Sequence, residues 1–556
     1  IIMKNYSKMP VKVQKKSGFD KSFQNLFTSK VGTITPILCD EVIPNTTINL
    51  KAAITAALPP LASDTFMRVK LKYAAFFVPT RILFPAGTYE KWLTGDDAID
   101  SATTIMSPRL IINSNDVTTD GTKVCAAGTL ADYLGIKVPK SSVSGSSVAW
   151  SLNVTALPFI GYHRIWNDWF RNSLVQKDIF NKSTYAAYEA GTLLNTVPSN
   201  RSLNAYQLRA DKRFTGQDGC IKFADGKLLT DLRQANFDID MYTTASPEPQ
   251  NGEAQSVSFK LTDENDQVLE NGSFTISALR AANSIQQWLE RNNIAGNRMV
   301  DYVKAQYGAN LSDYIAQRPV LLGSGAFDVF SKGIYQTGEW TGAGSDTNNP
   351  FKSVGSRYGS AFADGNDILI KNFTAEEPGY IYVLCWLSPR VTYSTGVNPM
   401  LKRYANAHSQ VEMANPILQN VGNEAINASD ITGDIASTGD NTIFGYQDRY
   451  YSWKDRIDEV HGLLKDQESL QWFALQRTFT SGAPEISSSF LEIPTGYLDQ
   501  VAAVSGDVSK FGYWADTYFD YKVSMPLAQY SVPSLQDPAY EHGVDIVVDT
   551  RGKQLS

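Results

Sequence analysis

Residues 66–79 read FMRVKLKYAAFFVP and carry the clearest fold signal in the chain. Apolar and basic residues alternate along the first half of this stretch. The apolar set is Met67, Val69, Leu71 and Tyr73, and the basic set is Arg68, Lys70 and Lys72. A repeat of two is the period of a β-strand, so the stretch predicts a strand with one buried face that ends near Pro79.

Other segments before and after this one also predict strands. Residues 46–57, TTINLKAAITAA, show the same alternation. The residues on their apolar face are Ile48, Leu50, Ala52 and Ile54. Residues 380–387, YIYVLCWL, are continuously apolar and predict a strand buried on both faces. Residues 543–549, GVDIVVD, predict a further strand near the C-terminus.

Helices are the minority in this pattern. Residues 157–170, LPFIGYHRIWNDWF, carry apolar residues at the spacing of one helix face, namely Tyr162, Ile165, Trp166, Trp169 and Phe170. Residues 275–307 predict two consecutive helices. Leu279, Ala282, Ile285 and Leu289 share one face of the first, and Gly308 is placed to cap the second.

Long polar stretches separate these elements, at residues 112–150, 182–235, 340–366 and 420–442. None repeats another, which argues against a solenoid or a propeller. A mainly β domain with large insertions fits best. We expect an eight-stranded antiparallel jelly roll with large loop and helical insertions, because its barrel needs only about 50–60 strand residues. Residues 31–556 would form this single domain, and residues 1–30 a separate arm.

Composition favours extensive contact with other protein. The chain has 556 residues, of which 19% are charged, with 27 Tyr and 26 Phe. Aromatic and uncharged polar surface is typical of protein interfaces. The net charge of −7 differs from the basic charge usual in chains that bind nucleic acid over their whole surface. Any contact with nucleic acid should therefore be local, or made by a more basic partner.

The cysteines, the histidines and the lengths of the apolar runs bear on disulfides, metal sites and membrane segments. Cys39, Cys125, Cys220 and Cys385 lie far apart, which favours buried free thiols in a reducing cytoplasm over disulfides, whose pairing cannot be read from the spacing. The four histidines are too scattered to suggest a zinc site. IIMKNYSKMPVKVQKK lacks the apolar stretch of a signal peptide, and no run of 18 apolar residues occurs. We therefore expect no membrane insertion.

The arm of residues 1–30 is the one feature with a plausible ligand. It contains seven lysines and a single acidic residue, Asp20. The lysines are Lys4, Lys8, Lys12, Lys15, Lys16, Lys21 and Lys30. Such a segment cannot bury enough apolar surface to fold alone. Lysines can neutralise phosphates, so Lys4, Lys8, Lys12, Lys15 and Lys16 are candidate nucleic-acid contacts. An arm that only solubilises the chain or crosses to a neighbouring subunit fits equally well. We expect Phe19, Phe23 and Phe27 to anchor its end on the protein rather than stack on bases.

A search for catalytic and cofactor motifs finds none, so we expect no catalytic residue, no cofactor and no bound metal. Glu376 and Glu377 are adjacent on an extended segment and should point to opposite faces, which favours solvated surface acids. Residues 262–272, TDENDQVLENG, lack the central glycine and the ligand spacing of a calcium loop. Trp166 and Trp169 have the spacing of residues that pack a helix, which favours packing over base stacking.

Several segments resemble, in order along the chain, a single protein family. Residues 157–172, LPFIGYHRIWNDWFRN, are the most specific match, and MRVKLKYAAFFVPTRILF begins at residue 67. FGYQDRYYSWKDRIDEVHGLL and VSMPLAQYSVPSL follow at residues 444–464 and 523–535. Together the matches span residues 17–535. They resemble the major capsid protein of gokushovirus-like microviruses, which are small icosahedral single-stranded DNA bacteriophages.

The resemblance implies a jelly-roll subunit that self-assembles, with sixty copies forming a T=1 shell around circular single-stranded DNA. It implies assembly in the host bacterial cytoplasm and a place in the virion. The implied partners are minor virion proteins (a small basic DNA-binding protein and a pilot protein), an internal scaffolding protein and a host cell-surface receptor. A surface protrusion of the family is implied to contact the host. Our candidate for it is residues 182–235, with 250–272 and 340–366 as alternatives.

Two other classes of protein remain open. A secreted jelly-roll lectin or adhesin would explain the strands and aromatic residues, but it predicts a signal peptide and usually a calcium or sugar site, and neither is visible. A carbohydrate-active enzyme on a β-sandwich needs two convergent carboxylates, which the sequence does not exclude.

Overall fold

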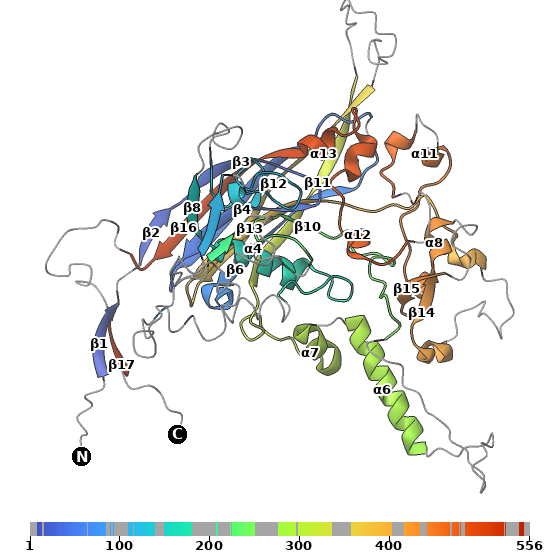
Figure 1. Cartoon of the computed structure of the whole chain (residues 1–556), viewed down its shortest axis with the longest axis horizontal. Coiled ribbons are helices and arrows are strands. Elements are labelled where there is room, and N and C mark those ends of the chain that lie inside the picture. Colours follow the sequence, from blue (N-terminus) through green and yellow to red (C-terminus); the bar gives the residue numbers. More distant parts are fainter. Residues whose placement is uncertain are drawn as a thin grey trace, which may run out of the picture.

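The arrangement of the chain comes from a computed structural model (Figure 1). It describes residues 8–13, 16–63, 65–84, 109–114, 116–138, 150–180, 207–209, 225–250, 276–295, 298–335, 357–402, 416–433, 442–466, 470–477, 484–527 and 544–549, with a few single residues between these ranges. None of the described helices is long and apolar enough to cross a membrane.

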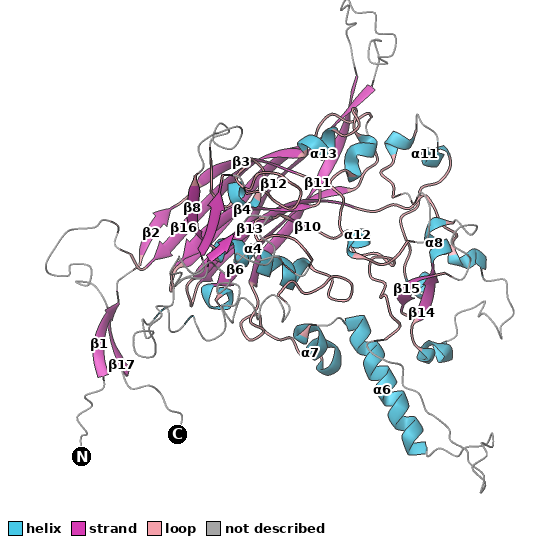
Figure 2. Cartoon of the chain, in the orientation of Figure 1, coloured by secondary structure: helices cyan, strands magenta, loops and turns pink. Residues whose placement is uncertain are grey.

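Ten of the described strands join one antiparallel sheet, which dominates the molecule (Figure 2). Across the sheet the order is β10 (Arg233–Gln234), β4 (Thr33–Val42), β13 (Gly379–Pro389), β6 (Val69–Pro79), β11 (Val320–Tyr335), β12 (Arg357–Thr374), β5 (Thr47–Ala57) and β16 (Tyr513–Met525). Strands β2 (Ser17–Asp20) and β3 (Phe23–Ser29) both pair along β16. The predicted mainly β fold is confirmed.

The sheet folds back on itself at β11 and β12. The first part of β11 pairs with β6, and its last part pairs with the start of β12, which then continues along β5. Side chains from the two halves meet in the core. Tyr73 on β6 donates to Asp367 on β12, Phe77 lies 5.2 Å from Phe373 between ring centres, and Tyr521 on β16 donates to Asp40 on β4 at 2.8 Å.

The strand predictions from periodicity are confirmed. Along β5 the residues alternate between buried and more exposed, and Ile48, Leu50 and Ile54 are fully buried. Strand β13 is buried along nearly its whole length because it is covered on both faces, as the continuous apolar run predicts. The C-terminal segment forms β17 (Val544–Asp549), which pairs with β1 (Lys8–Val13) rather than with the large sheet.

Three longer helical segments lie outside the sheet. Helix α4 (Leu157–Ile165) continues into a wider turn, η3 (Trp166–Phe170). Helices α6 (Ile276–Ala295) and α7 (Met299–Tyr307) are the predicted consecutive pair, and Gly308 ends α7 in the left-handed conformation (φ 67°) that glycine adopts without strain.

The remaining elements are short. The strands are β7 (Arg109–Asn113), β8 (Ser151–Thr155), β9 (Gln207–Arg209), β14 (Glu424–Asn427) and β15 (Ile443–Gln447). The α-helices are α2 (Leu130–Tyr133), α8 (Ala428–Thr432), α10 (Tyr451–Lys454), α11 (Leu463–Asp466), α12 (Ser488–Leu491) and α13 (Asp507–Phe511). The 3-10 turns are η1 (Thr80–Leu83), η5 (Pro399–Lys402), η6 (Pro416–Val421), η7 (Gln471–Phe473) and η8 (Tyr497–Val501).

The three stretches proposed for a surface protrusion fall largely outside the described residues. Of residues 182–235, the structure describes 207–209, which form β9, then Phe223 and residues 225–235. Leu228, Leu229 and Arg233 are buried in the body of the protein. Residues 251–272 are outside the described part. Residues 357–366 of the third stretch belong to β12.

The end of the basic arm is part of the sheet. Residues 17–29 form β2 and β3, which add to the edge of the sheet beside β16. Phe23 packs against Phe519 at 5.1 Å between ring centres, and Phe27 is buried against Tyr513. These contacts confirm that Phe23 and Phe27 anchor the arm on the protein.

Candidate assembly and nucleic-acid surfaces

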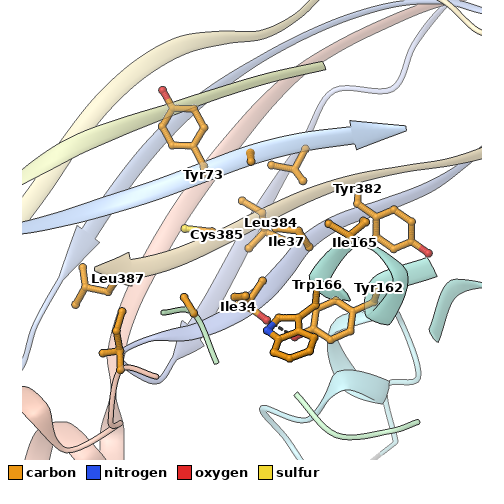
Figure 3. Close-up of a cluster of buried hydrophobic side chains, with 14 of the residues drawn as sticks. Ile34, Ile37, Tyr73, Tyr162, Ile165, Trp166, Tyr382, Leu384, Cys385 and Leu387 are labelled. Atoms are coloured by element: carbon orange, nitrogen blue, oxygen red, sulfur yellow. Dashed lines mark hydrogen bonds between the residues drawn. The ribbon is translucent and has the colours of Figure 1, made fainter. Parts of the chain in front are cut away.

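The aromatic segment α4–η3 closes one side of the sheet core. Its polar groups bond to backbone carbonyls of other elements. The Tyr162 hydroxyl donates to the carbonyl of Ile34 on β4 at 2.7 Å (Figure 3). The indole N–H of Trp166 donates to the carbonyl of Gln234 at 2.9 Å. The Trp169 indole donates to the carbonyl of Pro319. Trp166 is buried, and Trp169 lies 5.7 Å from Phe76 between ring centres, so both tryptophans pack within the protein, as their spacing predicts.

Glycine at position 161 permits the close approach of α4 to β13. A Cβ atom there would lie 2.4 Å from the Tyr382 hydroxyl oxygen, well inside contact distance. That hydroxyl in turn donates to the carbonyl of Pro158 at 2.8 Å. The helix and the strand are thus joined where no larger residue fits.

A buried polar cluster beneath α4 was not predicted from the sequence. Arg233 is fully buried, and its Nε–H donates to Nδ1 of His163 at 2.9 Å. Because Nδ1 accepts, Nε2 carries the ring proton and donates to the carbonyl of Leu229 at 2.9 Å. The guanidinium pairs with Asp225 and lies 4.7 Å from the Trp166 ring centre. Burial, and next the Arg233 charge, holds the pKa of His163 well below its usual range, so the ring is neutral.

The cysteines are not placed for chemistry. Cys39, Cys125 and Cys385 are free thiols, and Cys220 lies outside the described residues. Burial raises the pKa of Cys39 and of Cys385 to about 12, and that of Cys125 to about 11. A thiol with so high a pKa carries almost no thiolate near neutral pH, so none of the three is a ready nucleophile.

The described residues offer no group of three or more His, Cys, Asp or Glu that could hold a metal ion. The two adjacent acids that the sequence analysis considered, Glu376 and Glu377, are a solvent-exposed residue and an ion-paired residue. Glu376 is exposed, whereas Glu377 accepts two hydrogen bonds from the Arg81 guanidinium at 3.1 and 3.2 Å. Residues 262–272 lie outside the described part of the chain.

Of the five candidate arm lysines, Lys8, Lys12 and Lys16 fall within the described residues. Lys4 and Lys15 are outside them. Lys8 and Lys12 lie on β1, where their register partners on β17 are Asp549 and Asp545. Lys16 is exposed and its ammonium donates to the Thr47 hydroxyl at 3.1 Å. The acidic register partners were not anticipated, because the pairing of the two chain ends is not visible in the sequence.

Large apolar side chains remain exposed on the single chain. Helix α6 stands away from the strands and leaves Leu279, Ile285 and Trp288 between 42% and 46% exposed (Figure 1). Elsewhere, the side chains with more than 65% of their surface exposed are Leu26, Phe66, Ile239, Met299, Tyr307, Ile315, Leu401 and Ile417. So much exposed apolar surface is typical of a protein that buries it against partners.

Comparison with known proteins gives a consistent result. Residues 7–535 match the family described as capsid protein (F protein). The chain is 25% identical to capsid protein VP1 of Bdellovibrio phage phiMH2K, over 95% of this chain and 97% of the relative. It is 23% identical to capsid protein VP1 of Chlamydia phage 1, over 96% and 98% of the two chains.

A third relative, capsid protein VP1 of Spiroplasma virus 4, is 23% identical over 47% of this chain and 46% of its own. The family match covers nearly the whole chain, including all ten strands of the large sheet. The chain therefore belongs to the capsid protein (F protein) family and serves as a major capsid protein, as its resemblance to the microvirus proteins predicted.

Proposed function

We propose that sixty copies of this capsid protein close into a T=1 icosahedral shell around circular single-stranded DNA. The observation that carries the proposal is the family match over residues 7–535. The exposed apolar side chains of α6 support it, because identical subunits can cover such surfaces under rotational symmetry. The protein then acts by assembly rather than by catalysis.

We further propose that the folded-back sheet is an eight-stranded jelly roll. Numbered along the chain, its strands would be β3, β4, β5, β6, β11, β12, β13 and β16. The pairing order supports this: β3, β16, β5 and β12 are neighbours in one half, and β4, β13, β6 and β11 in the other. These are the orders 1-8-3-6 and 2-7-4-5 of a jelly roll, and β2 would extend the first half.

The shell proposal can be tested by co-expressing the chain with its companion virion proteins and imaging the purified product by electron microscopy. Closed particles roughly 25–30 nm across are expected for sixty such subunits. A chain that stays monomeric, or forms only small oligomers, in the presence of every companion protein would overturn the proposal.

The basic arm is proposed to contact the packaged DNA through Lys4, Lys8, Lys12, Lys15 and Lys16. We expect a variant with all five changed to glutamine to form shells but to retain less DNA, because phosphate contacts are lost while the arm keeps its length. The DNA content per particle, measured by the ratio of absorbance at 260 and 280 nm, is the readout. Removal of residues 1–17 should lower DNA content in the same way. Normal DNA content in both variants would contradict the contact.

Host contact is proposed for the stretch 182–235. Its described end, residues 225–235, lies in the body of the protein and would form the base of the protrusion. The minor virion proteins, an internal scaffolding protein and a host cell-surface receptor are the further partners that we propose for the assembling and mature particle.

A further inference from the structure

A cavity lies between the start of β4, the loop around α2 and the C-terminal end of α13. Its volume is about 630 Å³, within the roughly 300–1,000 Å³ typical of small-molecule sites. Threonine and serine side chains form much of its wall, and three lysines contribute to it. The lysines are Lys30, Lys227 and Lys510, and the acids in the lining are Asp120 and Asp231.

Among the three lysines, Lys227 is the one whose charge is lowered in stability by burial. Its ammonium makes no hydrogen bond or ion pair with any described residue. Burial, and next the Arg233 charge, lowers its pKa, whereas Glu492, Asp225 and Asp231 act in the opposite direction. A partly buried cation of this kind gains most from an anion that is brought into the cavity.

The nearby carboxylates are already engaged by other donors. Asp225 pairs with Arg233, and Glu492 accepts from Gln176 and Ser488. Asp231 accepts from the backbone N–H groups of Thr119 and Leu228 and from the Thr119 hydroxyl. Asp120 accepts from Thr118 and from the backbone N–H of Thr122. These bonds hold the carboxylates in place. Asp120 and Asp231 keep their negative charges, which the three lysines of the lining outnumber.

An aromatic ring stands at the same cavity. Phe511 lines it and is 54% exposed, with the ammonium of Lys510 4.8 Å from its ring centre. A second cavity of about 830 Å³ shares Thr28, Ala127, Gly128 and Tyr133 with the first, so the two adjoin. Trp514, which is 46% exposed, lines that second cavity. Cations beside exposed rings recognise a phosphate that carries a planar base.

We infer that this cavity binds a nucleoside phosphate, with Lys227, Lys30 and Lys510 on the phosphate and Phe511 against the base. The ligand could be one unit of a DNA strand or a free nucleotide. Its assignment to the strand rests on the proposed function, since only a shell around DNA brings a strand to every subunit. The adjoining cavity would then take the next bases of the strand.

The test uses the purified full chain and isothermal titration with three probes: inorganic phosphate, dTMP and a ten-residue oligothymidylate. We expect Lys227→Met to weaken dTMP binding about tenfold or more, because a charge-assisted bond is lost. Phe511→Ala should weaken dTMP binding but leave phosphate binding unchanged. Lys332→Met, which removes the same charge from an exposed position on β11, is the matched control and should bind as the wild type.

The oligonucleotide separates the two sources of the ligand. Tighter binding of the oligonucleotide than of dTMP assigns the site to a strand if Lys227→Met weakens it, because this variant keeps every lysine of the arm. Equal binding assigns it to free nucleotide. No dTMP binding, or binding that is the same in wild type and Lys227→Met, would overturn the inference. Because these titrations do not require particles, and particle formation is scored separately by electron microscopy, failure of the site and failure of the shell proposal are distinguishable.

Discussion

At the residue scale, the buried pair of His163 and Arg233 shows how much of the core depends on a few polar contacts. Arg233 cannot be solvated at its position, and the neutral ring of His163 accepts one of its N–H groups. The sequence shows both residues but not their contact, since 70 positions separate them. The lysine-lined cavity was missed for the same reason, because its wall is assembled from segments throughout the chain.

The His163 contact predicts acid sensitivity. The unfolded chain takes up a proton on this ring below about pH 6.5, whereas the folded chain does not, because the pKa of the buried ring is lowered. The unfolding free energy should therefore fall as the pH drops below 6.5, by up to about 1.4 kcal/mol per pH unit. Urea denaturation of unassembled subunits at pH 7.5 and 5.5 measures this loss.

The matched variant is His163→Gln, which can accept from Arg233 but has no titrating group. Its loss of stability between pH 7.5 and 5.5 should be smaller than that of the wild type by roughly 1.4 kcal/mol, since the window extends one unit below 6.5. An identical loss in both proteins would show that His163 is not the source.

At the element scale, local pattern predicts strands well and their partners poorly. The period of two predicted β5 and β6, and the apolar run predicted β13. These predictions succeed because a strand with one or two buried faces carries apolar side chains on those faces. Strands β2 and β3 were assigned to the arm instead. They are strands because they pair with β16, almost 500 positions away, and no local pattern reports such a pairing.

Helix α6 has the apolar face that the sequence predicts, but this face is not buried as the pattern predicts. Its predicted apolar face exists, but much of it is exposed on the single chain: Leu279 is 46% and Ile285 42% exposed. The amphipathic pattern predicts that this face is buried, and burial by another protein chain satisfies the pattern as well as burial within the subunit does. We therefore expect α6 to lie at a contact between subunits.

This expectation can be tested with Ile285→Lys. A charge on the exposed apolar face should lower the yield of assembled particles while leaving the melting temperature of the subunit nearly unchanged, because the side chain is not part of the subunit core. Gln287→Lys is the control, since Gln287 is exposed on the opposite face of the same helix. Equal particle yields from both variants, measured by sedimentation, would argue against an α6 interface.

At the scale of the whole molecule, the net charge and the exposed apolar side chains fit a subunit of a protein shell. The chain is acidic overall, with a formal charge of −7, which is why we propose DNA contact only for local surfaces, namely the arm and the lysine-lined cavity. Many moderate apolar contacts repeated by symmetry can stabilise a particle while each remains reversible during assembly. The sequence could predict this class of protein, because composition, missing catalytic motifs and the ordered resemblance agree.

The central claim is that this chain closes into a shell of sixty copies, and the mass of the purified empty particle tests it most directly. Sixty chains of 61.3 kDa predict a mass of about 3.7 MDa before any companion protein is counted. Charge-detection mass spectrometry of particles from co-expression should therefore show one population at or slightly above that value. A population limited to monomers or small oligomers, or a closed particle far from that mass, would contradict the account.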